Sequence, residues 1–227
     1  METVNNLLSI LSKGGWLMLP ILLTSIIAVA IIIDKYIVIR KAKVNIPALI
    51  VKIRGFLKHG DISGAHSYCL EKKSPITNII KKSLKKYHLG RERVKEALEN
   101  AGRQEITRLE KGLSLLATIS GVAPLLGFLG TVTGMIGAFM RIEDLQGGAN
   151  PSDLAGGIWE ALITTAFGLA VGIIAYTFYN FLTARITKLV MDMEAISNDL
   201  VDTIEEIKTD TKKLTSDDVE DEIELEL

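Results

Sequence analysis

The chain has little of the chemistry on which disulfide-rich, metal-binding or enzymatic domains depend. Its 227 residues include a single cysteine, Cys69, so no intramolecular disulfide can form. His66 lies three residues before Cys69, but two ligands without a second pair make a poor metal site, so we expect neither a metal nor a cofactor. The sequence also offers no catalytic dyad and no glycine loop of phosphate-binding form. We therefore expect a protein that is not an enzyme.

Charge is nearly missing from three long stretches, at 14–33, 112–140 and 154–184, and Glu160 is the only charged side chain in them. Each stretch reaches the roughly 20 residues that a helix needs to cross a bilayer. An alternating barrel pattern is absent, and backbone groups in lipid must be paired internally, so each stretch is predicted to be a helix. The predicted fold class is an all-α integral membrane protein with three transmembrane helices.

The distribution of basic residues predicts the orientation of these helices. The 34–111 segment holds 19 of the 26 lysines and arginines and only 8 acids, whereas the 1–13 and 141–153 segments hold one basic residue each. The positive-inside rule therefore predicts that 34–111 is a basic cytoplasmic domain, and that 1–13 and 141–153 lie outside. Glycine and Ser-Pro breaks divide the cytoplasmic domain into short predicted helices at 48–57, 62–70 and 76–87.

Helices two and three are predicted to continue from the membrane into the cytoplasm. No strong break separates Arg91 from the second span, so helix two is expected to begin near that residue. After the third span, the 185–207 extension carries apolar residues at steps of three and four, close to a heptad seam. That seam fits either a contact within the chain or a helical bundle between subunits. The acidic end at 208–227 is expected to be a flexible tail.

The second span carries glycines on one helix face. Gly127, Gly130, Gly134 and Gly137 are separated by steps of 3, 4 and 3. In lipid no hydrophobic force drives helices together, so small residues that allow close backbone approach mark a packing surface. We therefore expect another helix to pack tightly against this face. Pro124 in the same span is expected to kink or loosen the helix and to free a carbonyl group.

The third span carries a polar and small stripe of its own. Four of its residues recur every four positions and wind slowly around the helix: Glu160, Thr164, Gly168 and Gly172. Further hydroxyl groups come from Thr131 in span two and Thr165 in span three. A face of this composition is not expected to point toward lipid.

Three explanations of Glu160 remain open from the residues alone. It could carry protons in a pore, form a structural hydrogen bond between helices, or lie in the headgroup region at a helix end. Glu160 is two turns into the span, and the helix dipole acts mainly within the first turn. An ionised carboxylate at mid-membrane costs about 2.5–3.5 kcal/mol on insertion scales, a cost that binding a proton lowers. One such group makes no pathway, but a ring of several copies does.

The sequence of spans two and three resembles a known family. "APLLGFLGTVTGMIGAF" followed by "GGIWEALITTAFGLAVGIIAYTFYNFL" is similar to the MotA/TolQ/ExbB proton-channel family, most of all to its ExbB and TolQ branches. The three spans, the exterior N-terminus and the large basic cytoplasmic segment also resemble the topology of that family. The MotA branch usually has four spans, so the resemblance does not favour a flagellar stator.

The resemblance implies partners and a proton pathway. It implies a pentameric ring in the bacterial inner membrane around a dimer of a single-span protein like ExbD or TolR. Protons flowing down their gradient would then energise a periplasmic effector like TonB or TolA. Carried over to this sequence, the pathway residues are Glu160, Thr131 and Thr165, whereas the stripe alone favours Thr164. Pro124 matches the family's proline in span two.

A second class of function also stays open. In a non-conducting membrane scaffold, Glu160 would merely hydrogen-bond another helix, and glutamine would serve as well. The basic run "KKSLKKYH" at 81–88 fits the topology and an anionic lipid surface better than nucleic acid. Membrane lipids, and not nucleic acids, are therefore the expected partners of the basic segment.

Overall fold

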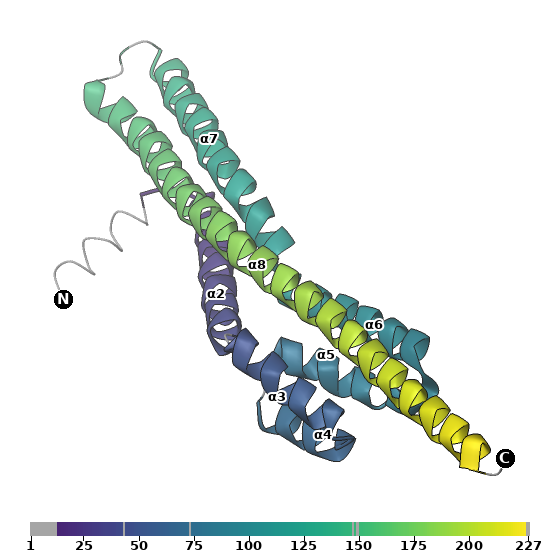
Figure 1. Cartoon of the computed structure of the whole chain (residues 1–227). Coiled ribbons are helices and arrows are strands. Elements are labelled where there is room, and N and C mark those ends of the chain that lie inside the picture. Colours follow the sequence, from purple (N-terminus) through teal and green to yellow (C-terminus); the bar gives the residue numbers. More distant parts are fainter. Residues whose placement is uncertain (1–12, 43, 73, 147, 149, 226–227) are drawn as a thin grey trace. The chain divides into compact units, whose positions relative to one another are not determined.

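The structure, a computed structural model, describes residues 13–42, 44–72, 74–146, 148 and 150–225, and every regular element in this part is a helix. The all-α prediction is confirmed for these residues. The exterior segment expected at 1–13 lies outside the described residues, except for Lys13. In chain order the elements are α2 (Met18–Ala42), α3 (Ile46–Lys58), α4 (Ile62–Glu71), α5 (Pro75–Leu84), the 3-10 helix η1 (Tyr87–Leu89), α6 (Arg91–Glu110), α7 (Leu113–Asp144) and α8 (Pro151–Leu225) (Figure 1).

Three helical segments of the described chain are long and apolar enough to cross a membrane, as the sequence predicts. They lie within Met18–Ala42, Arg91–Asp144 and Leu154–Ile207, and their most apolar windows have mean hydropathies of 2.3, 1.8 and 1.9. At most 33% of any of these windows is buried, so most of each span presents its side chains outward. Apolar outer faces of this kind are what a lipid environment accepts.

Helix two does not run unbroken from Arg91 through the second span, contrary to expectation. α6 begins at Arg91 as predicted but ends at Glu110, and Gly112 then has a φ of 89°, in the left-handed region. Glycine in that conformation is a common helix terminator, so α7 starts anew at Leu113. A Cβ on Gly112 would meet only the Ile31 side chain, at 3.6 Å, so the backbone conformation rather than lack of space favours glycine here.

α8 is longer than the sequence predicts. It begins at Pro151, the first helical position that proline favours, and continues to Leu225. The structure therefore gives a helix for 208–225, where we expected a flexible tail, because no glycine or proline follows Gly172 to stop the helix. α7 likewise extends to Asp144, so the connection between α7 and α8 is shorter than the predicted loop at 141–153.

The first of two compact units contains the chain up to Tyr36 and the segment 111–184. In it, α7 and the first part of α8 lie side by side (Figure 1). Leu17, just before α2, and Met18 and Ile21, at its start, are buried, whereas most apolar side chains farther along that helix are exposed. The first helix is therefore packed most closely at its N-terminal end.

The second unit contains Ile37–Glu110 and the chain from Arg185 onward. Its first three helices lie over the three predicted ones, although α5 ends at Leu84 and not at Tyr87, and each starts at a capping residue. Asn45 caps α3, Asp61 caps α4, and Ser74 caps α5 by accepting a hydrogen bond from the Thr77 backbone at 3.2 Å. Side-chain caps satisfy N–H groups that a helix leaves free at its start, so these polar residues fix the three boundaries.

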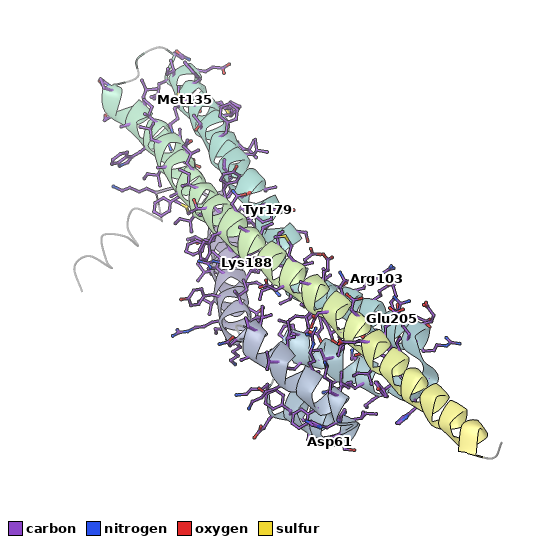
Figure 2. The ribbon with its side chains drawn as sticks, viewed as in Figure 1. Asp61, Arg103, Met135, Tyr179, Lys188 and Glu205 are labelled. Carbon is purple, nitrogen blue, oxygen red and sulfur yellow. The ribbon has the colours of Figure 1, made fainter. Side chains whose placement is uncertain are left out.

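The predicted seam on α8 is buried within the chain. Its buried residues in the second unit are Ile186, Met193, Ile196, Leu200 and Ile204. Ion pairs flank it: Arg54 of α3 meets Asp199 at 2.8 Å, and Glu205, labelled in Figure 2, meets Arg91 of α6 at 3.0 Å. These pairs are partly exposed and contribute little. The contact within the chain is thus the alternative that the structure shows, and a bundle between subunits stays a prediction.

Candidate functional site

α7 and α8 approach each other closely along a row of small residues. A Cβ built on Gly168 would lie 2.6 Å from the Ala123 carbonyl oxygen and 2.8 Å from the Gly127 Cα atom. A Cβ on Gly134 would lie 2.7 Å from the carbonyl oxygen of Gly157. These neighbours are backbone atoms, which no side-chain rotation can move aside. The two helices therefore pack backbone to backbone, as small residues allow in membranes.

Three of the four glycines expected on one face of span two lie against α8: Gly127, Gly130 and Gly134. Gly137 does not, because a Cβ there would meet no atom within 4 Å. The step of three from Gly134 turns the helix back by about 60°, whereas a step of four turns it forward by about 40°. Ala138, at that step of four, is the buried residue and lies against Gly157.

Pro124 packs against Gly172 in the same interface. A Cβ on Gly172 would overlap the proline ring and would lie 3.2 Å from the carbonyl oxygen of Ser120. That carbonyl is four residues before Pro124, which has no N–H to donate to it. It is therefore the carbonyl that loses its usual donor because of the proline, as the sequence predicts, and Gly172 leaves room for both the ring and the oxygen.

Two hydroxyl groups form a bridge between α7 and α8. The Oγ1 atoms of Thr131 and Thr165 are in hydrogen-bond contact. Thr165 Oγ1 also lies 3.0 Å from the Gly127 carbonyl oxygen on α7 and 3.0 Å from the Ala161 carbonyl oxygen on its own helix. Because each hydroxyl carries one proton, one donates to the other, which in turn can donate to a carbonyl. The pair, named here the threonine bridge, joins the helices within the span.

Thr164 has a different place from Thr165. It is fully buried, and its Oγ1 donates within α8, 2.9 Å from the Glu160 carbonyl oxygen and 3.1 Å from that of Ala161. Its side chain fills the space beside Gly130. The structure thus brings Thr131 together with Thr165, the threonine implied by the family resemblance, and uses Thr164, favoured by the stripe, in helix packing.

Glu160 is half-buried, and its carboxylate lies against the turn that precedes α2. A Cβ built on Gly15 would overlap Oε1 of Glu160 and would lie 2.5 Å from its Cδ atom. Gly15 has a φ of 63°, in the left-handed region. The carboxylate makes no hydrogen bond or ion pair with another described residue. It is therefore a carboxylate without a countercharge in the part of the chain that the structure describes.

The structure does not bring Glu160 to the threonine bridge. The five-residue step from Glu160 to Thr165 turns a helix by about 140°, whereas the step to Thr164 turns it by about 40°. Of the stripe on α8, Thr164, Gly168 and Gly172 therefore pack against α7, whereas Glu160 lies beside that contact and not in it. One chain therefore holds a carboxylate and a hydroxyl bridge on different sides of α8, without a hydrogen bond between them among the described residues.

The Glu160 carboxyl group is the ionisable group of this arrangement. A carboxyl group without a countercharge can bind a proton and release it, and when protonated it can donate a hydrogen bond. No group of three His, Cys, Asp or Glu side chains is placed to hold a metal ion in the described part of the chain. The threonine bridge, on another side of α8, adds two hydroxyl groups, which can donate and accept hydrogen bonds.

Sequence reasoning missed two glycines of the site, Gly15 and Gly157. Gly157 could have been found, because it lies seven residues before Thr164 and so continues the face that packs on α7. The Gly14-Gly15 pair ahead of the first span is a turn signal, but nothing in its spacing points to Glu160.

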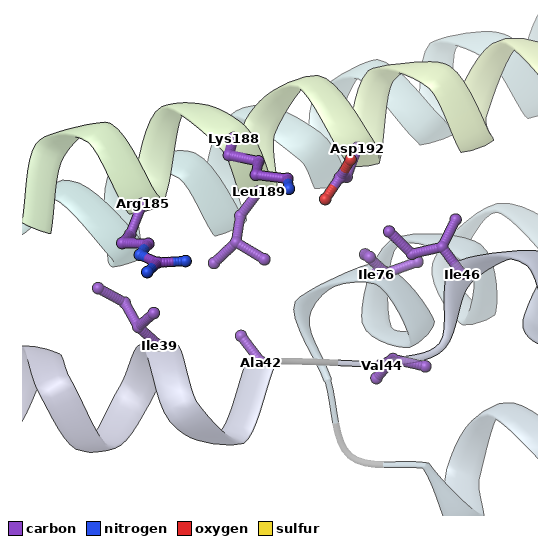
Figure 3. Close-up of a pocket in the computed structure, with 9 residues that line it drawn as sticks. All are labelled: Ile39, Ala42, Val44, Ile46, Ile76, Arg185, Lys188, Leu189 and Asp192. Atoms are coloured by element: carbon purple, nitrogen blue, oxygen red, sulfur yellow. The ribbon is translucent and has the colours of Figure 1, made fainter.

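The second unit contains pockets that lie outside this site. Figure 3 shows one of about 300 Å³, in which Arg185, Lys188 and Asp192 of α8 stand beside the apolar side chains Ile39, Ala42, Val44, Ile46, Ile76 and Leu189. Another, of about 440 Å³, is lined by Cys69 and Lys81 among others. Burial raises the pKa of the Cys69 thiol to about 11, and the Lys81 ammonium opposes that rise in part.

Comparison with known proteins points to one family. A sequence profile described as the MotA/TolQ/ExbB proton channel family matches residues 71–195, a range that contains α7 and the membrane part of α8. The chain is 33% identical over 195 residues to an ExbB-like biopolymer transport protein of Synechocystis sp., a match that covers 83% of this chain and 75% of the relative.

Two further relatives carry similar names. A protein named as an ExbB homolog in Methanothermobacter thermautotrophicus is 34% identical over 155 residues, which is 68% of this chain and 54% of that protein. The biopolymer transport protein ExbB of Xanthomonas campestris pv. campestris is 40% identical over 109 residues, 48% of this chain and 43% of that protein. The aligned part thus spans about half the length of each of these two relatives.

Proposed function

The chain belongs to the MotA/TolQ/ExbB proton channel family, and we propose that it is a proton-channel subunit of a motor complex in the bacterial inner membrane. In this proposal the proton gradient energises a periplasmic or outer-membrane process of the TonB-dependent kind. Glu160 is the group that binds and releases the proton. The energy available is about 2.3 kcal/mol per proton for each 100 mV of membrane potential.

The observation that carries the proposal is the setting of Glu160. It is the only charged residue between Leu154 and Ala184, and its carboxylate has no countercharge among the described residues. An ionised carboxylate in a span is costly unless it is paired or takes up a proton. Within one chain's described residues Glu160 has no such partner, so proton binding is the way in which this chain itself can lower that cost.

We further propose that several copies form a ring, pentameric as the family resemblance implies, around a dimer of an ExbD- or TolR-like single-span protein. The separation of Glu160 from the threonine bridge within one chain supports this, because groups from a neighbour are needed to join them. The complex would act on a TonB-like effector. The ExbB names of the relatives support that branch, and a TolQ-like role in outer-membrane maintenance is the alternative.

The proposed orientation places the N-terminus and the connection at 145–150 on the periplasmic side and the C-terminus in the cytoplasm. It is supported by the 19 basic residues of 34–111, most of which lie in the second unit. Lysine and arginine are retained on the cytoplasmic side of membranes. The two units then correspond to a membrane unit and a cytoplasmic unit.

Glu160→Gln tests the proton-carrying role, because glutamine has nearly the same shape and cannot ionise. We expect the complex to assemble with its single-span partner and to lose proton flux in liposomes. The matched control is Glu143→Gln, which removes a carboxylate from the exposed end of α7 and should leave the flux unchanged. Full flux in Glu160→Gln would contradict the role.

A second candidate function is favoured by one contact. Because the Glu160 carboxylate packs against Gly15, it could serve a non-conducting scaffold by holding α8 to the start of α2. In that case glutamine, which can also contact the turn, would replace glutamate without loss. The same flux measurement on Glu160→Gln therefore separates the scaffold from the channel.

A further inference from the structure

We infer that Gly15 is a positioning residue for the Glu160 carboxyl group. The inference rests on the proposed function of Glu160 and adds a residue from a distant part of the chain, ahead of the first span. The contact lies within the first compact unit, so both residues belong to one packed body. The carboxylate lies against the turn at Gly15, and this place is named here the seat.

The Glu160 carboxylate fits against the turn only because residue 15 has no side chain. The Cβ atom of any other residue would overlap Glu160 Oε1 and would lie 2.5 Å and 3.2 Å from its Cδ and Cγ atoms. Three atoms of the glutamate side chain thus lie against the place of the missing Cβ. The backbone at Gly15 is also left-handed, with a φ of 63°, a conformation that glycine adopts without strain.

The turn cannot withdraw easily from the carboxylate. Leu17 and Met18, two and three residues after Gly15, are both buried, with 2% exposure. The Met18 amide donates to the Gly15 carbonyl oxygen at 3.3 Å, and the Leu19 amide donates to the Trp16 carbonyl oxygen at 3.2 Å. These contacts hold residues 15–19 as the entrance to α2. Of the two partners, the end of the glutamate side chain is therefore the one that has to move.

Because the turn is held in place and the glutamate side chain can rotate, the effect of a side chain at position 15 can be predicted. Gly15→Ala would drive the Glu160 carboxyl group out of its seat, while rotation about the glutamate's single bonds lets the helices stay in place. The displaced carboxyl group would lose the cover of the turn. Its position relative to any proton donor or acceptor would change, although the group itself is still present.

The test is the rate at which a hydrophobic carbodiimide modifies Glu160 in membranes that contain the full-length chain, measured by mass spectrometry of the peptide. In Gly15→Ala we expect the modification to be several-fold faster than in the wild type, because the turn no longer covers the carboxyl group. Proton flux through the same variant, reconstituted with the single-span partner, is expected to fall. An unchanged or slower modification would overturn the assignment.

The matched control is Gly112→Ala. Gly112 is also left-handed, with a φ of 89°, but its Cβ would meet only Ile31 and lies away from Glu160. It therefore introduces the same kind of backbone strain in the same unit without touching the seat, and its modification rate should equal that of the wild type. A rise in both variants would assign the effect to strain and overturn the inference.

The two proposals fail in different ways. Full proton flux in Glu160→Gln would refute the proton-carrying role, whatever the modification rates are. Wild-type modification of Glu160 in Gly15→Ala would refute the positioning role of Gly15, even where Glu160→Gln abolishes flux.

Discussion

Gly168→Ala is the smallest change that tests the backbone-to-backbone packing of α7 and α8. The added methyl group would lie 2.6 Å from the Ala123 carbonyl oxygen, about 0.8 Å short of the 3.4 Å at which ordinary contact begins. It would also lie 2.8 Å from the Gly127 Cα atom. Because both neighbours are backbone atoms of α7, the helices have to move apart locally. Overpacking of this kind typically costs about 1–3 kcal/mol.

Moving the helices apart also weakens the threonine bridge. Gly127 carries the carbonyl oxygen that accepts from Thr165 at 3.0 Å, so the same displacement stretches that hydrogen bond. Interhelical hydrogen bonds in membranes are worth about 0.6 kcal/mol on average and up to about 1.7. Alanine has a higher helix propensity than glycine, which offsets up to about 1 kcal/mol. The net loss is about 1–3 kcal/mol, or about 5- to 150-fold in the folded-to-unfolded ratio.

The assay is reversible unfolding of the purified protein in mixed micelles, followed by tryptophan fluorescence. The matched control is Gly137→Ala, the same change on α7 at a position where a Cβ meets no atom within 4 Å. That variant should be as stable as the wild type or more stable by up to about 1 kcal/mol, through helix propensity alone. If Gly168→Ala and Gly137→Ala have the same stability, the close contact between the helices does not exist as described.

Two further predictions concern the threonine bridge and the buried thiol. Thr131→Val removes one bridging hydroxyl at nearly constant shape and should lower the free energy of unfolding by about 0.6–1.7 kcal/mol, whereas Thr118→Val, whose hydroxyl bonds only within α7, should change it little. The reaction of Cys69 with a maleimide should keep rising with pH above 9, because only the thiolate reacts and burial raises the pKa to about 11. A plateau near pH 9, typical of an exposed thiol, would contradict that burial.

The features that could be predicted from the sequence are those that the residues of a single helix determine. The gaps in charge predict three spans, because crossing a bilayer requires a minimum length of apolar helix. The steps of 3 and 4 place Gly127, Gly130 and Gly134 on one side of α7, and that side packs on another helix as expected. Extending the face by a further step of 3 to Gly137 is wrong, because the contact follows the step of 4 to Ala138.

Contacts between distant segments were not predictable in this way. Gly15 and Glu160 are 145 positions apart, and neither spacing nor composition pairs them. Thr164 and Thr165 differ by about 100° around the helix, so the threonine that meets Thr131 depends on a rotation that the whole interface sets. The break at Gly112 is different, because its Lys-Gly sequence is a local helix-end signal that the expectation of a continuous helix overlooked.

The glycine face of α7 packs against α8 of the same chain, and this limits the surfaces that are left for contacts between subunits. Gly127 and Gly134 are covered by α8 of the same chain, so they are not available to a second subunit. The outer faces of α7 and α8 instead expose large side chains, including Leu125, Phe128 and Ile173. The proposed ring would therefore not use these two glycines, and the α7–α8 pair forms a tightly packed unit within each chain. Because that pair fixes the threonine bridge and carries Glu160 at its edge, changes in the small residues should act on the fold of each subunit before they act on the ring.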